Sequence, residues 1–287
     1  MVQREVVPAI GCTEPIAVAL CVAKATEALG AKPEKIDVLL SANILKNAMG
    51  VGIPGTGMIG LPIAIALGAL IGKSEYQLEV LKDSNPAAVE EGKRFIGEKR
   101  IDISLKKNIT EKLYIEVCCK SGGNKATAII AGGHTTFIYI ARNGDVLLNK
   151  QSAGCGEEEA QVAGLTLRKV YDFAMNAPLD EIRFILETAR LNKAAAERSF
   201  DGNYGHGLGR MLRGNYEHKI LGDSVFSHIL SYTSGACDAR MAGAMIPVMS
   251  NSGSGNQGIS ATLPVLVYAE ENGKSEEELI RASCSAI

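Results

Sequence analysis

The chain has 287 residues, a length that accommodates one large domain or two of ordinary size. Lys and Arg number 30 against 32 Asp and Glu, and the net charge of −2 produces no overall field that would favour nucleic acid or an anionic membrane as a partner. Hydrophobic residues make up 46% of the sequence, which excludes general disorder, and aromatic residues at 5% offer few stacking surfaces for bases.

The N-terminal segment carries charges at Arg4 and Glu5 before any apolar run, so no secretory signal peptide is expected there. The weakly polar stretch 49–71 is interrupted by glycines and prolines that a membrane-spanning helix seldom tolerates. Seven cysteines, an odd number, do not predict a disulfide framework. These features predict a cytoplasmic protein with neither membrane nor nucleic acid as a partner.

The first part of the chain predicts two small-residue helices around a glycine-rich run. Apolar residues recur at helical spacing over 16–29, and Gly30 stands where a left-handed C-terminal cap is expected. Residues 36–42 form a short apolar segment that fits a strand or a helix. Residues 61–71, after the glycine-rich run, predict a buried helix.

From residue 76 the pattern changes to that of an α+β module. YQLEVL alternates, PAAVEEGKRFIGEK is typical of an amphipathic helix, and IDISLKK, KLYIEVCCK, KATAIIAGG and TTFIYIARNG predict successive strands. The turns SGGN and Asn143–Gly144 are typical of tight reversals between antiparallel strands.

After about residue 155 the pattern returns to helices. They are predicted over 157–176, 179–198, 224–233 and 258–271, and from 275 onward. The fold class that follows is α+β: a mainly helical lobe, residues 1–75 with 151–287, interrupted by an inserted α+β lobe, residues 76–150, with an antiparallel sheet and a helix.

The motif GCTEP, residues 11–15, places Cys12 at the start of a helix. A thiol there faces unpaired backbone N–H groups and the positive end of the helix dipole, which favours the thiolate needed for attack or metal ligation. The structural alternative is a capping turn with Thr13 as the N-cap and Cys12 as a small buried residue. The motif alone leaves both open.

The loop NAMGVGIPGTG, residues 47–57, brings four glycines and a proline between two apolar segments. Its backbone, around Gly52, could approach a small anionic ligand closely and donate N–H groups. It lacks the Gly-Lys-Ser/Thr of a phosphate-binding P-loop. Close helix packing is the alternative, but this does not explain Asn47 or Thr56.

Two further motifs offer charged or titratable groups. His134 in GGHTT lies at a turn between strands, where it could act as a general base, although most lone histidines in turns are only surface residues. Arg240 in SGACDARMAGA offers a planar fork for a substrate carboxylate, and Asp238 could orient it. The alternative is an internal ion pair at a helix start.

The stretch SNSGSGNQGIS, residues 250–260, is almost wholly Ser, Gly, Asn and Gln and leads into a helix. Such a segment builds N–H and hydroxyl donors at a helix N-terminus, which suits a carboxylate or phosphate. Its candidate donors are Asn251, Ser252, Ser254, Asn256 and Gln257. His206 and His228 show no metal-ligand spacing, and His228, in an apolar helical stretch, is expected to be a satisfied core histidine.

Five blocks together carry a resemblance to a known family. They are REVVPAIGCTEPIAVAL, NAMGVGIPGTGMIGLPIAIALGAL, GGHTT, SYTSGACDARMAGA and SNSGSGNQGISATLPV. In this order they resemble the L-cysteine desulfidase family, related to the alpha chain of iron–sulfur L-serine dehydratases, over nearly the whole chain. The resemblance implies an oxygen-sensitive lyase with a [4Fe–4S] cluster in place of pyridoxal phosphate, which converts L-cysteine to pyruvate, ammonia and sulfide.

The resemblance also implies residue roles. A cluster iron without a protein ligand would bind the leaving thiol or hydroxyl while a base removes the α-proton, and Cys12 would be the first cluster ligand. The family's other ligand cysteines lie in a helical region beyond the residue that corresponds to Ile287. We therefore expect this chain to be a C-terminally truncated fragment that is inactive and holds no cluster.

The similarity further suggests a substrate pocket between Cys12, the loop at 47–56, Arg240 and the segment 251–257, with His134 reaching in from the inserted lobe. His134 is a candidate for the α-proton base, and Lys46 is another if burial keeps its amine neutral.

Several alternatives stay open at this point. Nothing in these residues separates L-cysteine from L-serine, so a serine dehydratase-like deaminase is a second possibility. A non-catalytic protein that binds an amino acid or anion is a third, and redox signalling through a reactive Cys12 thiol is a fourth. The expected partners are a small amino-acid substrate and, through exposed apolar surface, further copies of the chain in a homo-oligomer.

Overall fold

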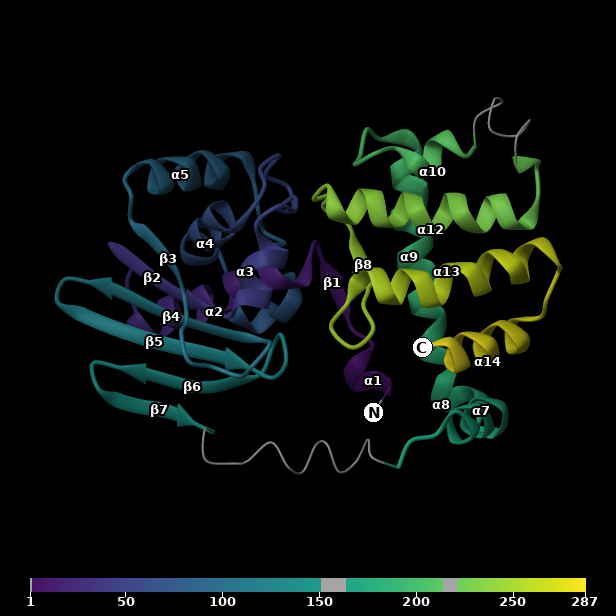
Figure 1. Cartoon of the computed structure of the whole chain (residues 1–287), viewed down its shortest axis with the longest axis horizontal. Coiled ribbons are helices and arrows are strands. Elements are labelled where there is room, and N and C mark those ends of the chain that lie inside the picture. The colour runs from purple at the N-terminus through teal and green to yellow at the C-terminus, as the bar shows by residue number, and fades with distance from the viewer. Residues whose placement is uncertain (1, 151–163, 214–220) are drawn as a thin grey trace. The chain divides into compact units, whose positions relative to one another are not determined.

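The computed structural model describes residues 2–150, 164–213 and 221–287, and the chain divides into two compact units (Figure 1). Unit 1 comprises Met1–Pro8, Gly154–Met241 and Pro247–Ile287, and unit 2 comprises Ala9–Ala153 and Ala242–Ile246. Helices, a six-stranded mixed sheet and a two-stranded sheet make the fold α+β, which confirms the predicted class.

Unit 2 is built on the six-stranded sheet, whose strand order is β3-β2-β4-β5-β6-β7. Its strands are β2 (Lys35–Leu40), β3 (Ile101–Leu105), β4 (Tyr114–Ser121), β5 (Asn124–Ala131), β6 (Phe137–Arg142) and β7 (Asp145–Asn149). The pairings are antiparallel except that β2 and β3 run parallel, so the sheet is mixed and the expected antiparallel sheet is only part of it. Asn143 and Gly144 have φ of 52° and 100°, as a tight hairpin turn between β6 and β7 requires.

The predicted lobes and the observed units divide the chain differently. Residues 9–75 belong to the same unit as the sheet, because β2 lies inside the sheet between β3 and β4. The ambiguous segment 36–42 is therefore mostly a strand, with Ile36, Val38 and Leu40 buried on one face. Only residues 1–8 of the predicted first part lie with the later helices.

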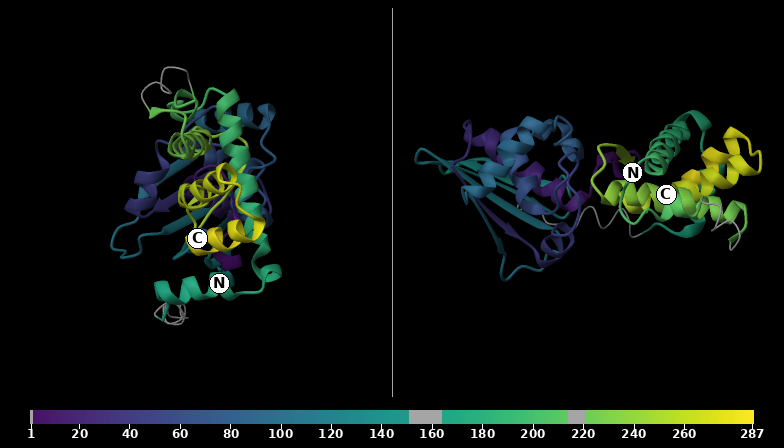
Figure 2. Two further views of the ribbon diagram at one scale, coloured as in Figure 1. Left: turned by 90° about the vertical axis from the view of Figure 1, so that its right-hand side faces the viewer. Right: turned by 90° about the horizontal axis from the view of Figure 1, so that it is seen from above.

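The helices of unit 2 gather on one face of its sheet (Figure 2). They are α2 (Thr13–Leu29), α3 (Ala42–Ala48), α4 (Leu61–Leu70), the 3₁₀ helix η1 (Ser74–Glu79) and α5 (Pro86–Gly97). Helix α2 packs against β4 and β5 and against α4. Because it is covered by other elements in this way, α2 is apolar nearly all round. It ends at Gly30 with a φ of 75°, as predicted.

Small residues allow α2 and α4 to approach closely. A Cβ on Gly68 of α4 would lie 2.6 Å from the carbonyl oxygen of Ala19 in α2. The alternating segment 76–81 begins in η1 and is not a strand, because Glu27 accepts hydrogen bonds from both the backbone nitrogen and the hydroxyl of Ser74, at 2.7 and 2.6 Å. These bonds fix the first turn of η1 against α2.

Unit 1 is mainly helical. Its described elements include α1 (Val2–Glu5), α7 (Leu167–Asn176), α8 (Leu179–Ile182), the 3₁₀ helix η2 (Arg183–Ile185), α9 (Leu186–Asp201), α10 (Leu208–Met211), α12 (Val225–Met241), α13 (Gly255–Glu271) and α14 (Glu276–Ala286). Helix α12 packs against α9 and α13, and α13 packs against α14. Strand β8 (Pro247–Met249) pairs with β1 (Pro8–Ile10) in the two-stranded sheet.

The first residues of the chain are held within unit 1 by the segment that follows β8. The backbone nitrogens of Ser250 and Ser252 donate to the carbonyl oxygens of Val7 and Glu5, at 2.9 and 3.0 Å. Val6 packs in a small cluster with Leu191 and Met249. The two ends of the sequence therefore belong to one unit.

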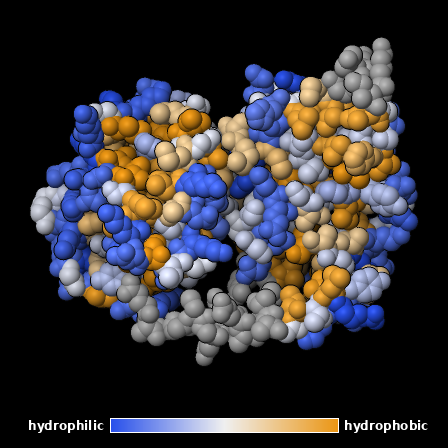
Figure 3. Space-filling model, viewed as in Figure 1, coloured by the Kyte–Doolittle hydropathy of each residue, from blue (hydrophilic) through white to orange (hydrophobic). Residues whose placement is uncertain are grey.

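Most of the helices predicted after residue 155 are present, with shifted bounds. The first predicted helix, 157–176, is observed as α7 from Leu167, and residues 151–163 lie outside the described residues. The motif SGACDARMAGA lies mostly in the last turns of α12 and not at a helix start. Large apolar side chains are exposed on α10 and α12, including Met211 and Phe226, and Figure 3 shows apolar surface over these helices.

Among the helices within residues 2–150, 164–213 and 221–287, none is both long enough and apolar enough to cross a membrane.

Candidate functional site

The N-terminus of α2 carries a cluster of polar side chains around Glu14. Cys12 occupies the N-cap position, is 6% exposed, and its Sγ donates to Glu14 Oε2 at 3.0 Å. Thr13 Oγ1 donates to the same oxygen at 3.2 Å, and Asn47 Nδ2 from α3 donates to Glu14 Oε1 at 3.3 Å. Thr13, expected as the N-cap, is instead the first residue of the helix.

The environment of Glu14 favours its ionised form. Burial acts to raise the pKa of this carboxyl, but hydrogen bonds from Cys12, the backbone and Thr13, together with the charge of His134, outweigh burial and lower the pKa below its ordinary value. His134 lies in the turn between β5 and β6 and interacts electrostatically with Glu14. The structure thus brings two predicted residues, Cys12 and Asn47, to one carboxylate by hydrogen bonds, and the charge of a third, His134, acts on the same carboxylate.

Two predicted residues of the glycine-rich loop serve the loop itself. Thr56 Oγ1 donates to the carbonyl oxygen of Ile53 at 2.8 Å and accepts from the backbone nitrogen of Met58 at 3.0 Å. A Cβ on Gly52 would lie 2.4 Å from the carbonyl carbon of Ala242. The glycine therefore permits a close approach between two chain segments of unit 2, and the ligand-facing roles expected for Gly52 and Thr56 have a structural alternative.

Lys46 does not meet the condition on which its candidacy depends. It lies in the last turn of α3, and its side chain is exposed instead of buried. Of the two proposed bases, His134 is the one whose charge acts on Glu14 in the polar cluster.

Arg240 and Asn256 meet in unit 1. Arg240, at the end of α12, is 3% exposed, and its Nη1 donates to Asn256 Oδ1 at 2.9 Å. Asp238 does not pair with Arg240: its carboxylate accepts from the backbone nitrogens of His206 and Leu208, at 3.2 and 2.9 Å. The expected ion pair, and the expected orienting role of Asp238, are therefore wrong.

The polar segment before α13 has mixed roles. Ser254 is the N-cap of α13 and accepts from the backbone nitrogen of Gln257, whose side chain is exposed. Asn251 is buried, and its Nδ2 donates to the carbonyl oxygen of Ile287 at 2.9 Å. Ser252, with a φ of 49°, donates to Asn251 Oδ1 at 3.1 Å. The helix N-terminus is as predicted, whereas Asn251 and Ser252 mainly hold the local chain.

The predicted site residues fall into two groups, one in each unit. Cys12, Lys46, Asn47, Gly52, Thr56 and His134 lie in unit 2, and Arg240, Asn251, Ser252, Ser254, Asn256 and Gln257 lie in unit 1. The shared pocket expected from the resemblance stays a prediction. Glu14 is the residue that the sequence reasoning missed, although it lies inside GCTEP, two positions after the cysteine.

The donor set around Cys12 does not match that of an iron–sulfur cluster. Such clusters are held by several cysteine thiolates, with histidine replacing some of them in certain centres. Cys12 has a carboxylate as its hydrogen-bond partner, and no group of three His, Cys, Asp or Glu suited to a metal ion occurs among the described residues. These residues alone therefore do not fit a [4Fe–4S] cluster.

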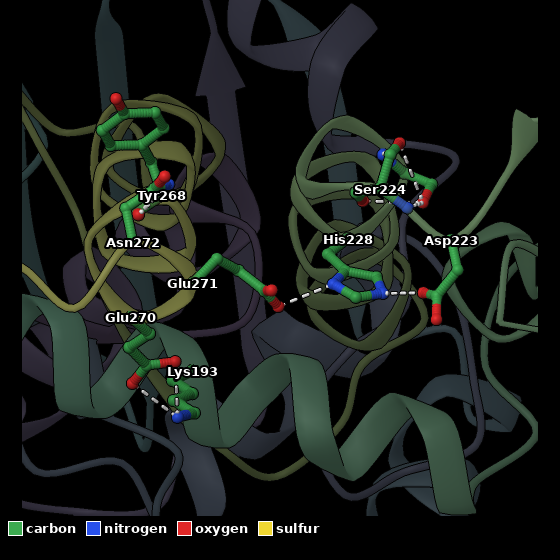
Figure 4. A network of polar contacts seen from close by, with 9 residues as sticks. Lys193, Asp223, Ser224, His228, Tyr268, Glu270, Glu271 and Asn272 are labelled. Carbon is green, nitrogen blue, oxygen red and sulfur yellow. Dashed lines mark hydrogen bonds and ion pairs between the residues drawn. The ribbon is translucent and has the colours of Figure 1, made fainter.

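His228 differs from the expected core histidine. It lies on α12 with 26% of its side chain exposed and is bracketed by two carboxylates (Figure 4). Its Nδ1 lies 2.6 Å from Glu271 Oε1 of α13, and its Nε2 lies 2.6 Å from Asp223 Oδ1. The hydrogen bond with Glu271 is the main cause that raises the pKa of His228; burial opposes it, and the bond with Asp223 adds to it.

Comparisons with known proteins place these residues in a family. Residues 75–286 match the family described as serine dehydratase alpha chain, a range that includes His134, Arg240 and 251–257 but not Cys12. A UPF0597 protein of Bacteroides fragilis is 82% identical over 282 residues, and one of Chromobacterium violaceum is 47% identical over 281. Both comparisons cover 98% of this chain, which spans 66% and 65% of the two relatives' lengths. No solved structure matches.

Proposed function

Because the chain belongs to the serine dehydratase alpha chain family, we propose that it is part of a lyase that eliminates the β-substituent of an L-amino acid. L-Cysteine is the first substrate that we propose, with pyruvate, ammonia and sulfide as products, and L-serine is the second. The five sequence blocks that resemble L-cysteine desulfidases support this order. The structural observation that carries the proposal is the ionised Glu14 between Cys12, Asn47 and His134.

In the proposed reaction a base removes the proton from Cα, and the electron pair of this C–H bond forms the Cα–Cβ double bond. The Cβ–S bond breaks, and sulfur leaves with the electron pair and takes up a proton. The aminoacrylate then tautomerises to an imine, which water hydrolyses to pyruvate and ammonia.

We assign the base to His134. An imidazole is suited to proton removal near neutral pH, and a neighbouring carboxylate stabilises the imidazolium that forms. Glu14 supplies this negative charge, and hydrogen bonds from Thr13 and Asn47 hold its carboxylate in place whether or not Cys12 keeps its proton. Glu14 is thus a positioning residue that acts through His134.

The proposed cofactor is the [4Fe–4S] cluster implied by the resemblance, with Cys12 as one ligand. Since the described residues do not supply the other ligands, we propose that these come from the third of the family's chain that this sequence does not span. The six cysteines that the structure describes form no disulfide, which supports a reducing compartment such as the cytoplasm.

The test is turnover after anaerobic reconstitution with iron and sulfide. This chain and the longer Bacteroides fragilis relative are each supplied with L-cysteine or L-serine, and pyruvate is measured. We expect pyruvate from the relative with at least one of the two amino acids. No pyruvate from either amino acid, in a preparation whose visible absorption shows a bound cluster, would falsify the lyase proposal.

Variants then test the residue roles in the active form. His134→Gln should lower kcat by about 100-fold or more, as loss of a general base does, with little change in KM. Glu14→Gln should lower kcat and also shift the acidic limb of the pH–rate profile, because it removes the charge beside His134. His206→Gln, at an exposed histidine of unit 1, is the matched control and should leave kcat unchanged. Equal effects of His206→Gln and His134→Gln would contradict the assignment.

A further inference from the structure

The guanidinium of Arg240 is a buried charge without a buried counter-charge. The residue is 3% exposed, and its hydrogen-bond partners, Asn256 Oδ1 and Met241 Sδ, are both uncharged. Its Nε is buried and has no hydrogen-bond partner. Among the residues that the structure describes, no carboxylate forms an ion pair with Arg240. Such an arrangement is unfavourable unless another group supplies the negative charge.

The unpaired side of this guanidinium faces the first residue of α13. A Cβ built on Gly255 would lie 2.2 Å from Nε and 2.6 Å from Cζ, so the glycine is what lets the guanidinium lie against the start of this helix. The hydrogen bond from Nη1 to Asn256 Oδ1 fixes the plane of the group. Helix α13 has 17 residues, and its N-terminus carries a partial positive charge. The guanidinium of Arg240 and the N-terminus of α13 therefore both favour a negative charge close to Gly255.

The acidic and thiol groups nearest to Arg240 in sequence do not serve as its counter-charge. Asp238 uses both carboxylate oxygens on the backbone nitrogens of His206 and Leu208. Burial raises the pKa of the Cys237 thiol, although the charge of Arg240 opposes this shift, so the thiol stays protonated at neutral pH. The negative charge has to come from outside the described residues.

We propose that Arg240, together with Asn256 and the first turn of α13, binds the carboxylate of a small-molecule ligand. A guanidinium offers parallel N–H donors in a planar fork that matches the two oxygens of a carboxylate, and backbone N–H groups at a helix N-terminus add to the binding. This inference stands apart from the proposed function, whose residues lie in unit 2. Carboxylate binding itself does not require that function.

The test measures binding without turnover. The probe is 3-hydroxypropionate, which has a carboxylate but no amino group and therefore cannot yield the enamine, and inorganic phosphate and 3-hydroxypropionamide are compared with it. We expect calorimetric titration to show binding of 3-hydroxypropionate to the 287-residue chain and none of the neutral amide. Stronger binding of phosphate than of the carboxylate would overturn the assignment to a carboxylate.

Three variants connect the binding to Arg240. Arg240→Met should weaken binding by about 10- to 100-fold, and Arg240→Lys, which keeps the charge but loses the fork, by about 10-fold. Arg190→Met removes an exposed arginine of α9 in the same unit and should leave binding unchanged. Without ligand, Arg240→Met should melt at the same or a higher temperature, because it removes an uncompensated buried charge.

A purely structural arginine gives the opposite pattern. In that case Arg240→Met melts at a lower temperature without ligand, and 3-hydroxypropionate binds neither the wild-type chain nor the variants. This outcome overturns the inference even if the family reaction is later measured. Conversely, if Arg240-dependent binding is measured but the cluster-loaded Bacteroides fragilis relative gives no pyruvate, the inference stays intact and only the lyase proposal is removed.

Discussion

The bracketed histidine of α12 predicts a stability difference that depends on pH. A protonated imidazole donates from both ring nitrogens and can serve Glu271 and Asp223 at once, whereas a neutral imidazole has one N–H and leaves one carboxylate facing a lone pair. Replacing His228 by Gln removes this bracket between α12 and the residues around it. The variant should therefore be less stable than the wild type only where the wild-type imidazole is protonated.

The sign and the size of the effect follow from the structure. The folded pKa of His228 is raised above its ordinary value, which the unfolded chain restores. The contribution is therefore complete below about pH 6.5 and is lost as the pH rises through the folded pKa. The carboxylates of Asp223 and Glu271 are 69% and 39% exposed, so solvent screens both pairs and the total is about 1 kcal/mol.

Urea denaturation followed by far-UV circular dichroism measures this difference, since the chain has no Trp to report by fluorescence. We expect His228→Gln to lose about 1 kcal/mol at pH 5.5 and close to nothing at pH 9. Lys193→Met is the matched control: it removes the neighbouring pair with Glu270 (Nζ–Oε1 2.7 Å), whose hydrogen bond raises the pKa of Lys193, so that this ammonium is charged at both pH values. A His228→Gln deficit that is equal at both pH values, or larger at pH 9, would refute the reasoning.

Two further predictions concern unit 2. Gly52→Ala should lower the free energy of unfolding by about 2 kcal/mol, because the new Cβ would lie 2.4 Å from the backbone of Ala242. Gly50→Ala is the control, because a Cβ on Gly50 would meet open space; equal denaturation midpoints for the two variants would contradict the packing argument. Burial raises the pKa of Cys21 well above its ordinary range and that of Cys119 to about 12. In the folded chain both thiols should therefore resist iodoacetamide at pH 8, while the half-exposed Cys118 is alkylated. Mass spectrometry identifies the alkylated cysteines, and early labelling of Cys21 would count against this prediction.

Local patterns predicted most elements of unit 2, because the physics that forms them is local. The helix predicted over 16–29 and its left-handed cap at Gly30 are confirmed in α2. The tight turns between β4 and β5 and between β6 and β7 lie where their glycines indicate. The segment 76–81 shows where such reasoning ends. Its alternation favours a strand, but hydrogen bonds between Ser74 and Glu27, distant in sequence, fix a 3₁₀ turn there.

The division into units could not be predicted, because it depends on pairing between distant segments. The short apolar segment 36–42 fits a strand or a helix equally well, and only its insertion between β3 and β4 makes β2 a central strand. This pairing draws residues 9–75 into unit 2. The parallel pairing of β2 with β3 is likewise invisible in either strand alone.

The candidate site was predictable in its residue types and less so in their roles. Chemistry and resemblance indicate Cys12, Asn47 and His134; the first two form hydrogen bonds with Glu14, and the charge of His134 lowers the pKa of Glu14. Lys46 is exposed, whereas its candidacy as a base requires a buried amine. Thr56 uses its hydroxyl in hydrogen bonds within its own loop. A side chain's burial and its competing partners are set by tertiary packing, so a motif shows which chemistry is available and not which groups remain free to use it.

The segments from which the two units are assembled bear on how the chain folds during its synthesis. The stretch Ala242–Ile246 completes unit 2, and the strand and turn that hold residues 5–7 come later still. A ribosome therefore releases the whole six-stranded sheet before the segment that packs against Gly52 has been made, and residues 5–7 gain their partners only after residues 250–252 have been synthesised. The nascent protein must keep both apolar cores from aggregation until residues 242–252 have been synthesised.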